Sequence, residues 1–269
     1  TYISTLIHAD YLTISDKNIR LSNLNIGLIK LLNSAIVPMN AFNLFHFDIK
    51  SANILCDDNL DNKNKTSTPA VRLIDWGLAA KISDRNNIPN VIAGRPFQYN
   101  IPTGVVLLSK QDTLNRLLDE YKGMELTDTI YYSIASDYVD ILKKRRAGHL
   151  DEINNIINQL KQLMYKDAAY YISNDPVITN IAAILKKYTT NYKFDKIKYY
   201  QDVFINNVDV FGVIITYLPL VEHYLHHTKD NKISPPVVKL ANIILKYCYS
   251  DTYAVEKYSV EEVSASLLD

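Results

Sequence analysis

The sequence predicts a mainly α-helical fold with a few short β-strands, and three observations support this. Apolar residues recur at helical spacing over much of the 269-residue chain. The run with the clearest strand character, residues 71–74, is short and ends at a turn. Hydrophobic residues make up 48% of the chain and include 20 Tyr and 7 Phe, so the chain can bury a core. A disordered chain is therefore excluded.

The first predicted helix covers residues 22–45. Ser22 can serve as its N-cap, and a broad apolar face follows. This face consists of Leu24, Ile26, Leu28, Ile29, Leu31, Leu32 and Ile36. Pro38 is expected to bend or end the regular part, because proline lacks the N–H group that a helix interior requires. Residues 1–21 show no firm period, so no element is predicted there.

A mixed, mostly irregular region is expected next. Residues 57–69 are rich in Asn, Asp and Lys, which predicts an exposed loop before the strand at 71–74. The stretch 81–104 contains several residues that interrupt regular structure. These are Pro89, Gly94, Pro96 and Pro102.

Residues from about 109 to 188 are predicted to be helical. The clearest apolar face lies within them and consists of Ile153, Ile156, Ile157, Leu160, Leu163 and Met164. Asp175-Pro176 predicts a turn or a helix start, because proline fits the first helical position.

The C-terminal part is expected to contain three helices. Residues 208–220 are almost wholly apolar and predict a buried helix, and residues 229–236 predict a loop. The last two helices are expected at 237–249 and 260–268. Ser259, with Glu262 three residues later, forms a capping box for the final helix.

Charge and cysteine content exclude several classes of function. Lys and Arg number 29 and Asp and Glu number 29, so bulk charge does not indicate nucleic-acid binding. The basic run 143–146 is interpreted as a solvated helix face, with a phosphate, RNA or localisation patch as the alternative.

The apolar run 208–220 is too short to cross a bilayer and contains Asp209 and Pro219. Two cysteines do not make a disulfide framework, which favours reduced thiols inside a cell.

Four polar residues in the N-terminal half carry the chemistry. Asp48 and Lys50 are two apart, so both can face one pocket, and Asn53 and Asp75 offer hard oxygen ligands at the edge of apolar stretches. A carboxylate to take a hydroxyl proton, an ammonium group to hold a phosphate and two oxygen ligands for Mg²⁺ are the components of a phosphoryl-transfer site.

At these positions the sequence resembles the protein kinases. Their catalytic loop runs His-Arg-Asp, then Lys and Asn, and their metal motif is Asp-Phe-Gly. The corresponding runs here are His46-Phe47-Asp48-Ile49-Lys50-Ser51-Ala52-Asn53 and Asp75-Trp76-Gly77.

The resemblance implies a role for each residue. Asp48 is the implied catalytic base, and Lys50 the contact to the γ-phosphate of ATP. Asn53 and Asp75 are the implied ligands of the two Mg²⁺ ions and so bind the nucleotide. His46 is implied to be a structural residue beneath the metal motif. The lysine two places after the aspartate resembles the serine/threonine branch of the family.

The resemblance extends over residues 23–269. Residues 94–102 resemble the end of an activation segment, and Asp209 resembles the aspartate of the central buried helix that holds the backbone of the catalytic loop. The alternative for Asp209 is a helix N-cap. The last two helices also resemble those of the family.

The implied architecture is a kinase-like large lobe with short β-hairpins around the catalytic loop. Residues 1–108 contain a hinge remnant, the first helix, the catalytic loop and the activation segment. Residues 109–205 form a long helical insertion, and residues 206–269 form the remaining helices. The small lobe is expected outside this chain, because all seven glycines are isolated and too little sequence precedes residue 22 to build it. Thr1 in first place favours a longer parent.

Three departures from the family pattern bear on activity. Phe47 replaces the arginine that normally pairs with a phosphorylated activation segment, which argues against activation by phosphorylation there. The Ala-Pro-Glu end of the segment is absent, and Asn100-Ile101-Pro102 stands nearby. Trp76 replaces the phenylalanine of the metal motif.

Three functions remain open at this point. The first is a serine/threonine kinase that uses ATP and Mg²⁺ on a protein substrate, and the second is a pseudokinase or scaffold that docks a partner protein through the inserted helices. The third is a phosphotransferase for small molecules. A zinc site at Glu222, His223, His226 and His227 is an alternative use of that cluster. A composition rich in Asn, Ile, Lys and Tyr favours a large DNA virus as the source and a cytoplasmic or virion-associated location.

Overall fold

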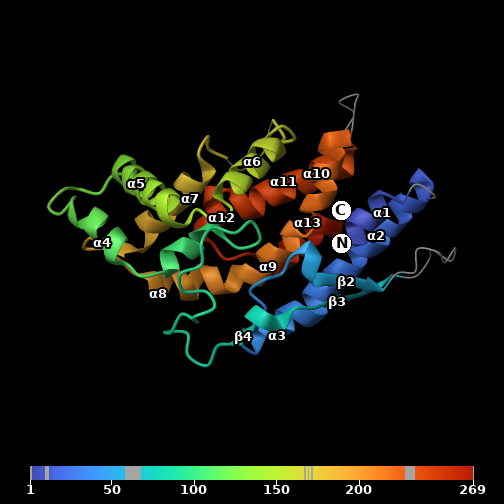
Figure 1. The fold of residues 1–269 in the computed structure, drawn as a ribbon, viewed down its shortest axis with the longest axis horizontal. Helices are drawn as coiled ribbons and strands as arrows, with labels where there is room; N and C mark the ends of the chain where they lie inside the picture. Colours follow the sequence, from blue (N-terminus) through green and yellow to red (C-terminus); the bar gives the residue numbers. More distant parts are fainter. Residues whose placement is uncertain are drawn as a thin grey trace.

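The computed structural model describes residues 2–9, 12–57, 68–166, 168, 170, 172–227 and 234–268. It is 63% helix and 7% strand, so the prediction of a mainly α-helical chain is confirmed. The strands within the described residues form three antiparallel pairs of two strands each. Figure 1 shows α1 and α2 at one end of the molecule and α4 and α5 at the other.

The N-terminal helices begin earlier than predicted. Helix α1 covers Tyr2–Ile7, and α2 covers Ile14–Leu31 with Thr13 and Asp16 as its capping box. The prediction of Ser22 as an N-cap is wrong, because Ser22 lies inside α2. The first turns of α2 are mostly exposed, so they carry no apolar stripe that the sequence could reveal.

The chain stays helical through Pro38. A π-helical turn, η1 (Leu32–Ile36), joins α2 to α3 (Val37–Ala41), which has proline in its first turn. The backbone N–H of Val37 donates to the carbonyl of Leu32, five residues earlier. Pro38 therefore coincides with a change in the hydrogen-bond pattern and does not end the helix.

Two strand pairs frame the region of interest. Strand β1 (Leu44–Phe45) pairs with β4 (Ala80–Lys81), and β2 (Ile54–Asp57) pairs with β3 (Ala70–Leu73). The predicted strand is confirmed, shifted by one residue. The pairing places residues 46–53, between β1 and β2, beside residues 74–79, between β3 and β4. Short 3₁₀ turns occupy part of each, η2 (Ser51–Asn53) and η3 (Trp76–Leu78).

The predicted helical block from about 109 to 188 is confirmed in four α-helices, although the described residues between α6 and α7 are turns and irregular chain. The 3₁₀ stretch η4 (Thr103–Leu108) precedes the block, and its helices are α4 (Asp112–Asp119), α5 (Asp128–Arg146), α6 (Leu150–Lys161) and α7 (Pro176–Tyr188). The apolar face of α6 is buried at Ile153, Ile156, Ile157 and Leu160, whereas the last two residues of the predicted face, Leu163 and Met164, lie beyond the end of the helix at Lys161. Helix α7 starts at Pro176, as predicted, and a short pair, β5 (Thr189–Thr190) with β6 (Lys193–Phe194), follows it.

The C-terminal helices complete the fold. They are α8 (Lys196–Tyr199), η5 (Tyr200–Phe204), α9 (Ile205–Ile215), α10 (Leu218–His227), α11 (Pro235–Ile244), η6 (Leu245–Tyr249), α12 (Asp251–Val255) and α13 (Val260–Leu268). The predicted helix 208–220 is divided at residues 216–217. Ser259 accepts the backbone N–H of Glu262 at 3.1 Å, which confirms one half of the predicted capping box. Most of the predicted loop 229–236 lies outside the described residues.

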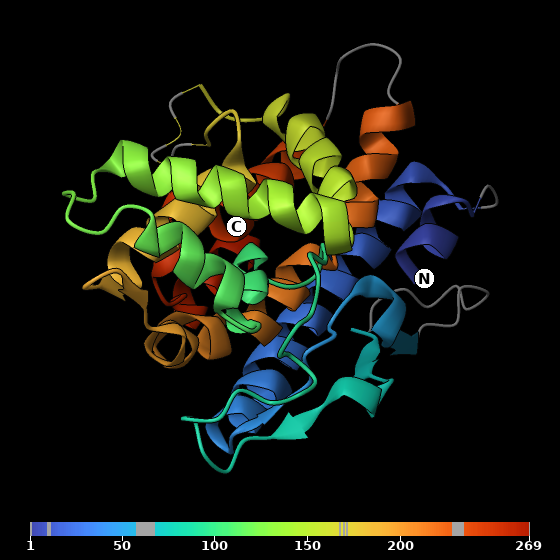
Figure 2. The same ribbon diagram turned by 60° about the vertical axis from the view of Figure 1, so that its left-hand side comes forward.

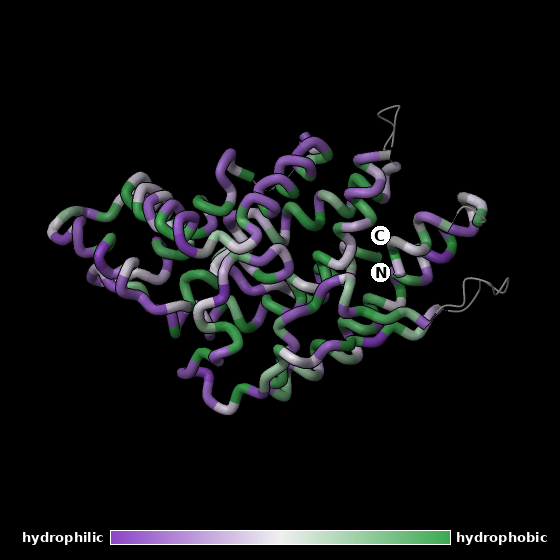
Figure 3. The backbone as a smooth tube through the Cα atoms, in the orientation of Figure 1, coloured by the Kyte–Doolittle hydropathy of each residue, from purple (hydrophilic) through white to green (hydrophobic). Residues whose placement is uncertain are grey.

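One hydrophobic core joins all parts of the chain. It contains side chains from the N-terminal helices, the helical block and the C-terminal helices, so the expected boundaries after 108 and 205 stay a prediction. Helix α9 crosses the middle of the molecule (Figure 1) and is buried over nearly its whole length. Figure 2 shows the pairs β1–β4 and β2–β3 on the side of the molecule away from α5 and α6, and Figure 3 shows hydrophilic residues along the outside of those two helices.

One helical stretch, Lys196–His226, has the length and composition that could cross a membrane. Its most apolar window is 89% buried inside the protein, as in the core helix of a soluble domain. The described residues therefore contain no clear membrane span.

Candidate active site

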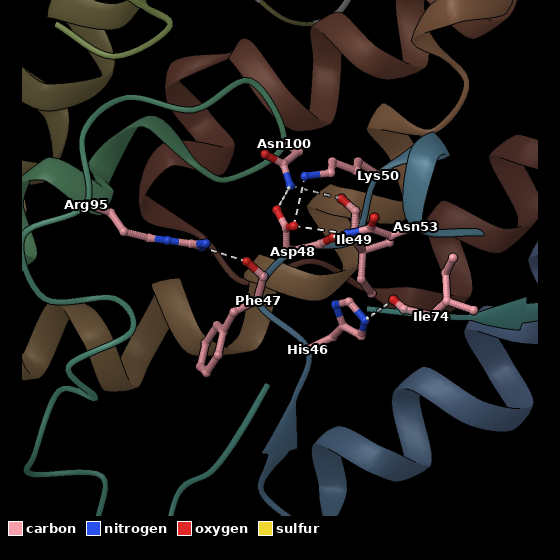
Figure 4. Close-up of polar contacts among 9 residues, drawn as sticks. All are labelled: His46, Phe47, Asp48, Ile49, Lys50, Asn53, Ile74, Arg95 and Asn100. Atoms are coloured by element: carbon pink, nitrogen blue, oxygen red, sulfur yellow. Dashed lines mark hydrogen bonds and ion pairs between the residues drawn. The ribbon is translucent and has the colours of Figure 1, made fainter. Parts of the chain in front are cut away.

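The loop of residues 46–53, called the site loop below, brings three of the four predicted residues together. The ammonium group of Lys50 lies 2.8 Å from Oδ2 of Asp48. The side-chain amide of Asn53 donates to Oδ2 of Asp48 at 3.0 Å and to its backbone carbonyl at 2.8 Å. Figure 4 shows the side chains of Lys50 and Asn53 converging on the Asp48 carboxylate.

Asp75 lies next to this group through its backbone. The N–H of Ile74 donates to the carbonyl of Asn53 at 3.0 Å, so the residue after Ile74 is close to the end of the site loop. Asp75 has a φ of 60°, in the left-handed region, and its side chain is exposed. No contact joins its carboxylate to Asp48, Lys50 or Asn53 within the described residues.

His46 supports the turn that carries Asp75, as predicted. Its Nε2 lies 3.0 Å from the carbonyl oxygen of Ile74, and because a carbonyl only accepts, Nε2 carries the proton. The imidazole is fully buried, with its ring centroid 4.9 Å from that of Trp76. The indole of Trp76 is 47% exposed.

Asp209 anchors the backbone of the site loop. Its two carboxylate oxygens accept the N–H groups of His46 and Phe47, each at 2.9 Å. With its amide in the orientation that suits both neighbours, Asn40 donates to the same carboxylate at 2.9 Å and to the carbonyl of Leu44. Burial raises the pKa of Asp209, and the two backbone N–H groups act against that rise.

The predicted role of Asp209 is therefore confirmed. The alternative, a helix N-cap, is wrong because Asp209 lies inside α9, which begins at Ile205. Its donors come from a part of the chain more than 160 residues earlier.

A second segment, residues 94–100, closes the other side of the site. The amide of Asn100 donates to Oδ1 of Asp48 at 2.9 Å and to the carbonyl of Ile49 at 3.3 Å. The guanidinium of Arg95 donates to the carbonyl of Phe47 at 2.7 Å. Neither contact could be predicted from the sequence, because Asn100 and Arg95 lie in an irregular stretch, 52 and 48 positions from their partners Asp48 and Phe47.

The surroundings of Asp48 hold it in the ionised form. Burial raises its pKa, but the Lys50 ammonium and the amides of Asn100 and Asn53 lower it by more. The pKa of Asp48 consequently lies below its ordinary value, and the carboxylate is negative at neutral pH.

Asn53 and Asp75 offer oxygen atoms of the kind that Mg²⁺ prefers. The amide nitrogen of Asn53 is occupied by Asp48, which leaves its oxygen for a cation, and the Asp75 carboxylate is exposed. Magnesium is commonly held by one or two protein oxygens together with waters and substrate phosphates, so two such ligands suffice.

Two other clusters were singled out by the sequence. Among the described residues no group of three or more His, Cys, Asp and Glu could hold a metal ion, so the zinc alternative at Glu222 and its neighbours is unsupported. In the basic run 143–146, Nζ of Lys143 lies 3.6 Å from Oδ1 of Asp140. The side chains of Lys144 and Arg145 are exposed, as expected of a solvated helix face. The side chain of Arg146 lies outside the described residues.

Comparison with protein-family models, with curated proteins and with solved structures finds no match for this chain.

Proposed function

We propose that this chain is the catalytic large lobe of a divergent serine/threonine protein kinase, which transfers the γ-phosphate of ATP to a protein hydroxyl. The observation that carries the proposal is the set of three donors, Lys50, Asn53 and Asn100, around the Asp48 carboxylate. A carboxylate kept ionised in this way can accept a proton from a hydroxyl group at neutral pH.

The proposed reaction uses two residues of the site loop directly. The substrate hydroxyl attacks the γ-phosphorus while its proton passes to Asp48. A new oxygen–phosphorus bond forms, the bond from the γ-phosphorus to the bridging oxygen breaks, and ADP leaves. The ammonium of Lys50 forms an ion pair with Asp48 in this structure. In the proposed reaction it would contact the γ-phosphate oxygens and offset their negative charge.

The cofactors follow from the same residues. Mg²⁺ held by Asn53 and Asp75 would neutralise charge on the phosphate oxygens of ATP. The proposal includes a small lobe outside this chain, because all seven glycines here are isolated and none forms a glycine-rich loop.

Phosphate transfer by the full-length parent protein tests the proposal. Replacing the base, Asp48→Asn, is expected to lower transfer by roughly a hundredfold to ten-thousandfold. Asp119→Asn, with an exposed side chain at the last residue of α4, is the matched control and should leave the rate unchanged. Equal transfer by the wild type and Asp48→Asn would reject the proposal.

A second candidate is a kinase-derived module that binds a partner protein through the helices of residues 109–205. It is favoured by the exposed Asp75 carboxylate, which contacts none of the other three site residues in the described part of the chain. This candidate predicts no Mg²⁺-dependent nucleotide binding. Thermal stabilisation of the chain by ATP with Mg²⁺, absent with ATP and a chelator, would contradict it.

Both candidates act on or bind another protein, and both fit a location in the cytoplasm or in a virion. Neither Cys56 nor Cys248 forms a disulfide within the described residues, as is usual in a reducing compartment.

A further inference from the structure

Segment 94–100 is held on two sides. Towards the site loop, Arg95 and Asn100 donate to Phe47, Asp48 and Ile49. Towards the helical block, the segment contacts the turn between α5 and α6. The backbone N–H of His149, in this turn, donates to the carbonyl of Phe97 at 2.9 Å.

Gly148 allows this close approach. Its φ is 57°, in the left-handed region that favours glycine. A Cβ atom at this position would lie 2.3 Å from the carbonyl oxygen of Phe97 and 2.8 Å from Cβ of Pro96. Any larger residue would therefore push segment 94–100 away from the turn.

His149 adds a side-chain contact. Its imidazole stacks on the ring of Tyr99, with centroids 5.5 Å apart and an angle of 16° between the planes. Nδ1 of the same ring lies 3.3 Å from Oε2 of Glu152, on the first turn of α6, which fixes the orientation of the imidazole. Tyr99 is the immediate neighbour of Asn100, so this stack holds the backbone that carries the Asp48 contact.

Segment 94–100 has few groups through which phosphorylation could hold it in place. Between Asp75 and Asn100 the hydroxyl side chains are Ser83 and Tyr99. Phe47 carries no charge, and the guanidinium of Arg95 already donates to a backbone carbonyl. The turn between α5 and α6 supplies the contacts that a phosphate and an arginine would otherwise supply.

We propose that Gly148 and His149 are positioning residues, which hold segment 94–100 so that Asn100 stays on Asp48 without any modification of the segment. The catalytic consequence rests on the proposed kinase function. The contact that holds segment 94–100 against the turn between α5 and α6 does not depend on that function, because it is a property of the fold.

Two measurements on the full-length protein separate these points. Hydrogen exchange of the amides of residues 95–101 reports the holding, and steady-state phosphate transfer reports the positioning. Gly148→Ala should speed exchange there by roughly tenfold or more, the equivalent of one lost hydrogen bond. It should lower kcat by roughly tenfold to a hundredfold and leave the KM for ATP unchanged, because displacement of a positioned group affects the chemical step.

The chain offers matched controls. Gly123 also has a positive φ, of 87°, but a Cβ there would meet nothing within 4 Å, so Gly123→Ala should leave exchange at 95–101 and kcat unchanged. His149→Ala removes the stack, whereas His149→Phe keeps an aromatic ring on Tyr99 and should restore kcat. Asn100→Ala should lower kcat as Gly148→Ala does, and the double variant should lose no more than either single variant.

Each outcome decides the matter. Unchanged exchange in both Gly148→Ala and His149→Ala overturns the holding role, and faster exchange with unchanged kcat overturns the positioning role. If His149→Phe loses as much kcat as His149→Ala, stacking on Tyr99 is not the contact that matters and the role of His149 is rejected. If the wild type transfers no phosphate, the proposed kinase function fails, and the exchange rates still decide whether the turn holds the segment.

Discussion

Gly212 of α9 lies directly against the backbone of Ile49 in the site loop. A Cβ atom at Gly212 would stand 2.6 Å from the carbonyl oxygen of Ile49 and 2.7 Å from its Cβ. Three residues earlier on the same helix, Asp209 binds the backbone of His46 and Phe47. Helix α9 therefore determines the path of the site loop by direct contact and by hydrogen bonding.

Gly212→Ala is expected to destabilise the protein. The added methyl group meets backbone atoms on a buried interface, and such overpacking costs about 1–3 kcal/mol of unfolding free energy. Urea unfolding measures the change. Gly77→Ala serves as the control, because the nearest atom to its Cβ is Oδ1 of Asp75 at 3.4 Å, an ordinary contact. Equal midpoints for the two variants would contradict the close packing of α9 on the site loop.

Asp209→Asn is expected to lower stability while nearly keeping the shape of the side chain. The amide has one acceptor oxygen, so one of the two N–H groups that Asp209 binds loses its partner in a buried place, at a cost of about 1–3 kcal/mol. The free energy of unfolding in urea gives the difference. Asp202→Asn, which removes the partner of Lys198 on the surface, should cost at most about 1 kcal/mol.

Asn100→Ala is expected to raise the pKa of Asp48. The Asn100 amide donates to the ionised carboxylate and so stabilises the charged form, and its removal leaves Lys50 and Asn53 as donors. A titration of the Asp48 carboxyl followed by ¹³C NMR measures the shift.

The same substitution should change how stability depends on pH. Because the folded-state pKa of Asp48 is depressed, its contribution is present above the unfolded-state pKa and is lost as the pH falls through the folded value. Asn100→Ala should therefore lose less stability on acidification than the wild type. An unshifted Asp48 pKa would show that the hydrogen bond to Asn100 is not formed in solution.

Glu222→Gln is expected to stabilise the protein at neutral pH. Burial raises the pKa of Glu222, His226 lowers it, and the nearby Glu152 raises it, with a net rise. A raised folded-state pKa means that the folded state holds its proton more tightly, so stability falls as the pH rises from the unfolded-state pKa through the folded value. The neutral amide escapes that loss.

Melting temperatures at two pH values check this prediction. The gain of Glu222→Gln should appear near pH 7 and vanish near about pH 4, where the glutamate is itself largely protonated. Glu120→Gln, at the exposed end of α4, should show no such difference. A gain of equal size at both pH values would point to a cause other than charge.

Regular elements with a strong apolar stripe could be predicted from the sequence. The face of α6 and the proline at the start of α7 identified those helices, because burial on one side leaves a period of 3.6 residues. The start of α2 could not be predicted in this way, because its first turns are largely exposed and its capping box precedes any apolar pattern. The division of the helix 208–220 was missed for the opposite reason, since a helix buried on all sides shows no period.

The part of the candidate site whose residues are close in sequence could be predicted. Asp48, Lys50 and Asn53 lie within six positions, and local geometry brings them together. Asn100 and the turn at Gly148 reach the same place only through tertiary packing, and single polar or glycine residues in irregular stretches carry no periodic signal. Asp209 is the exception. A charged residue in an apolar helix requires buried hydrogen-bond partners, so its role in binding another part of the backbone could be predicted from the sequence.

The anchoring of the site loop on α9 has a consequence for heat inactivation. A buried helix such as α9 unfolds only when the whole domain unfolds. The site loop is bound to this helix, so it is not expected to unfold at a lower free energy than the domain. Warming should consequently abolish the nucleotide binding that we propose and the far-ultraviolet circular dichroism in a single shared transition, and the site loop should not unfold before the rest of the molecule.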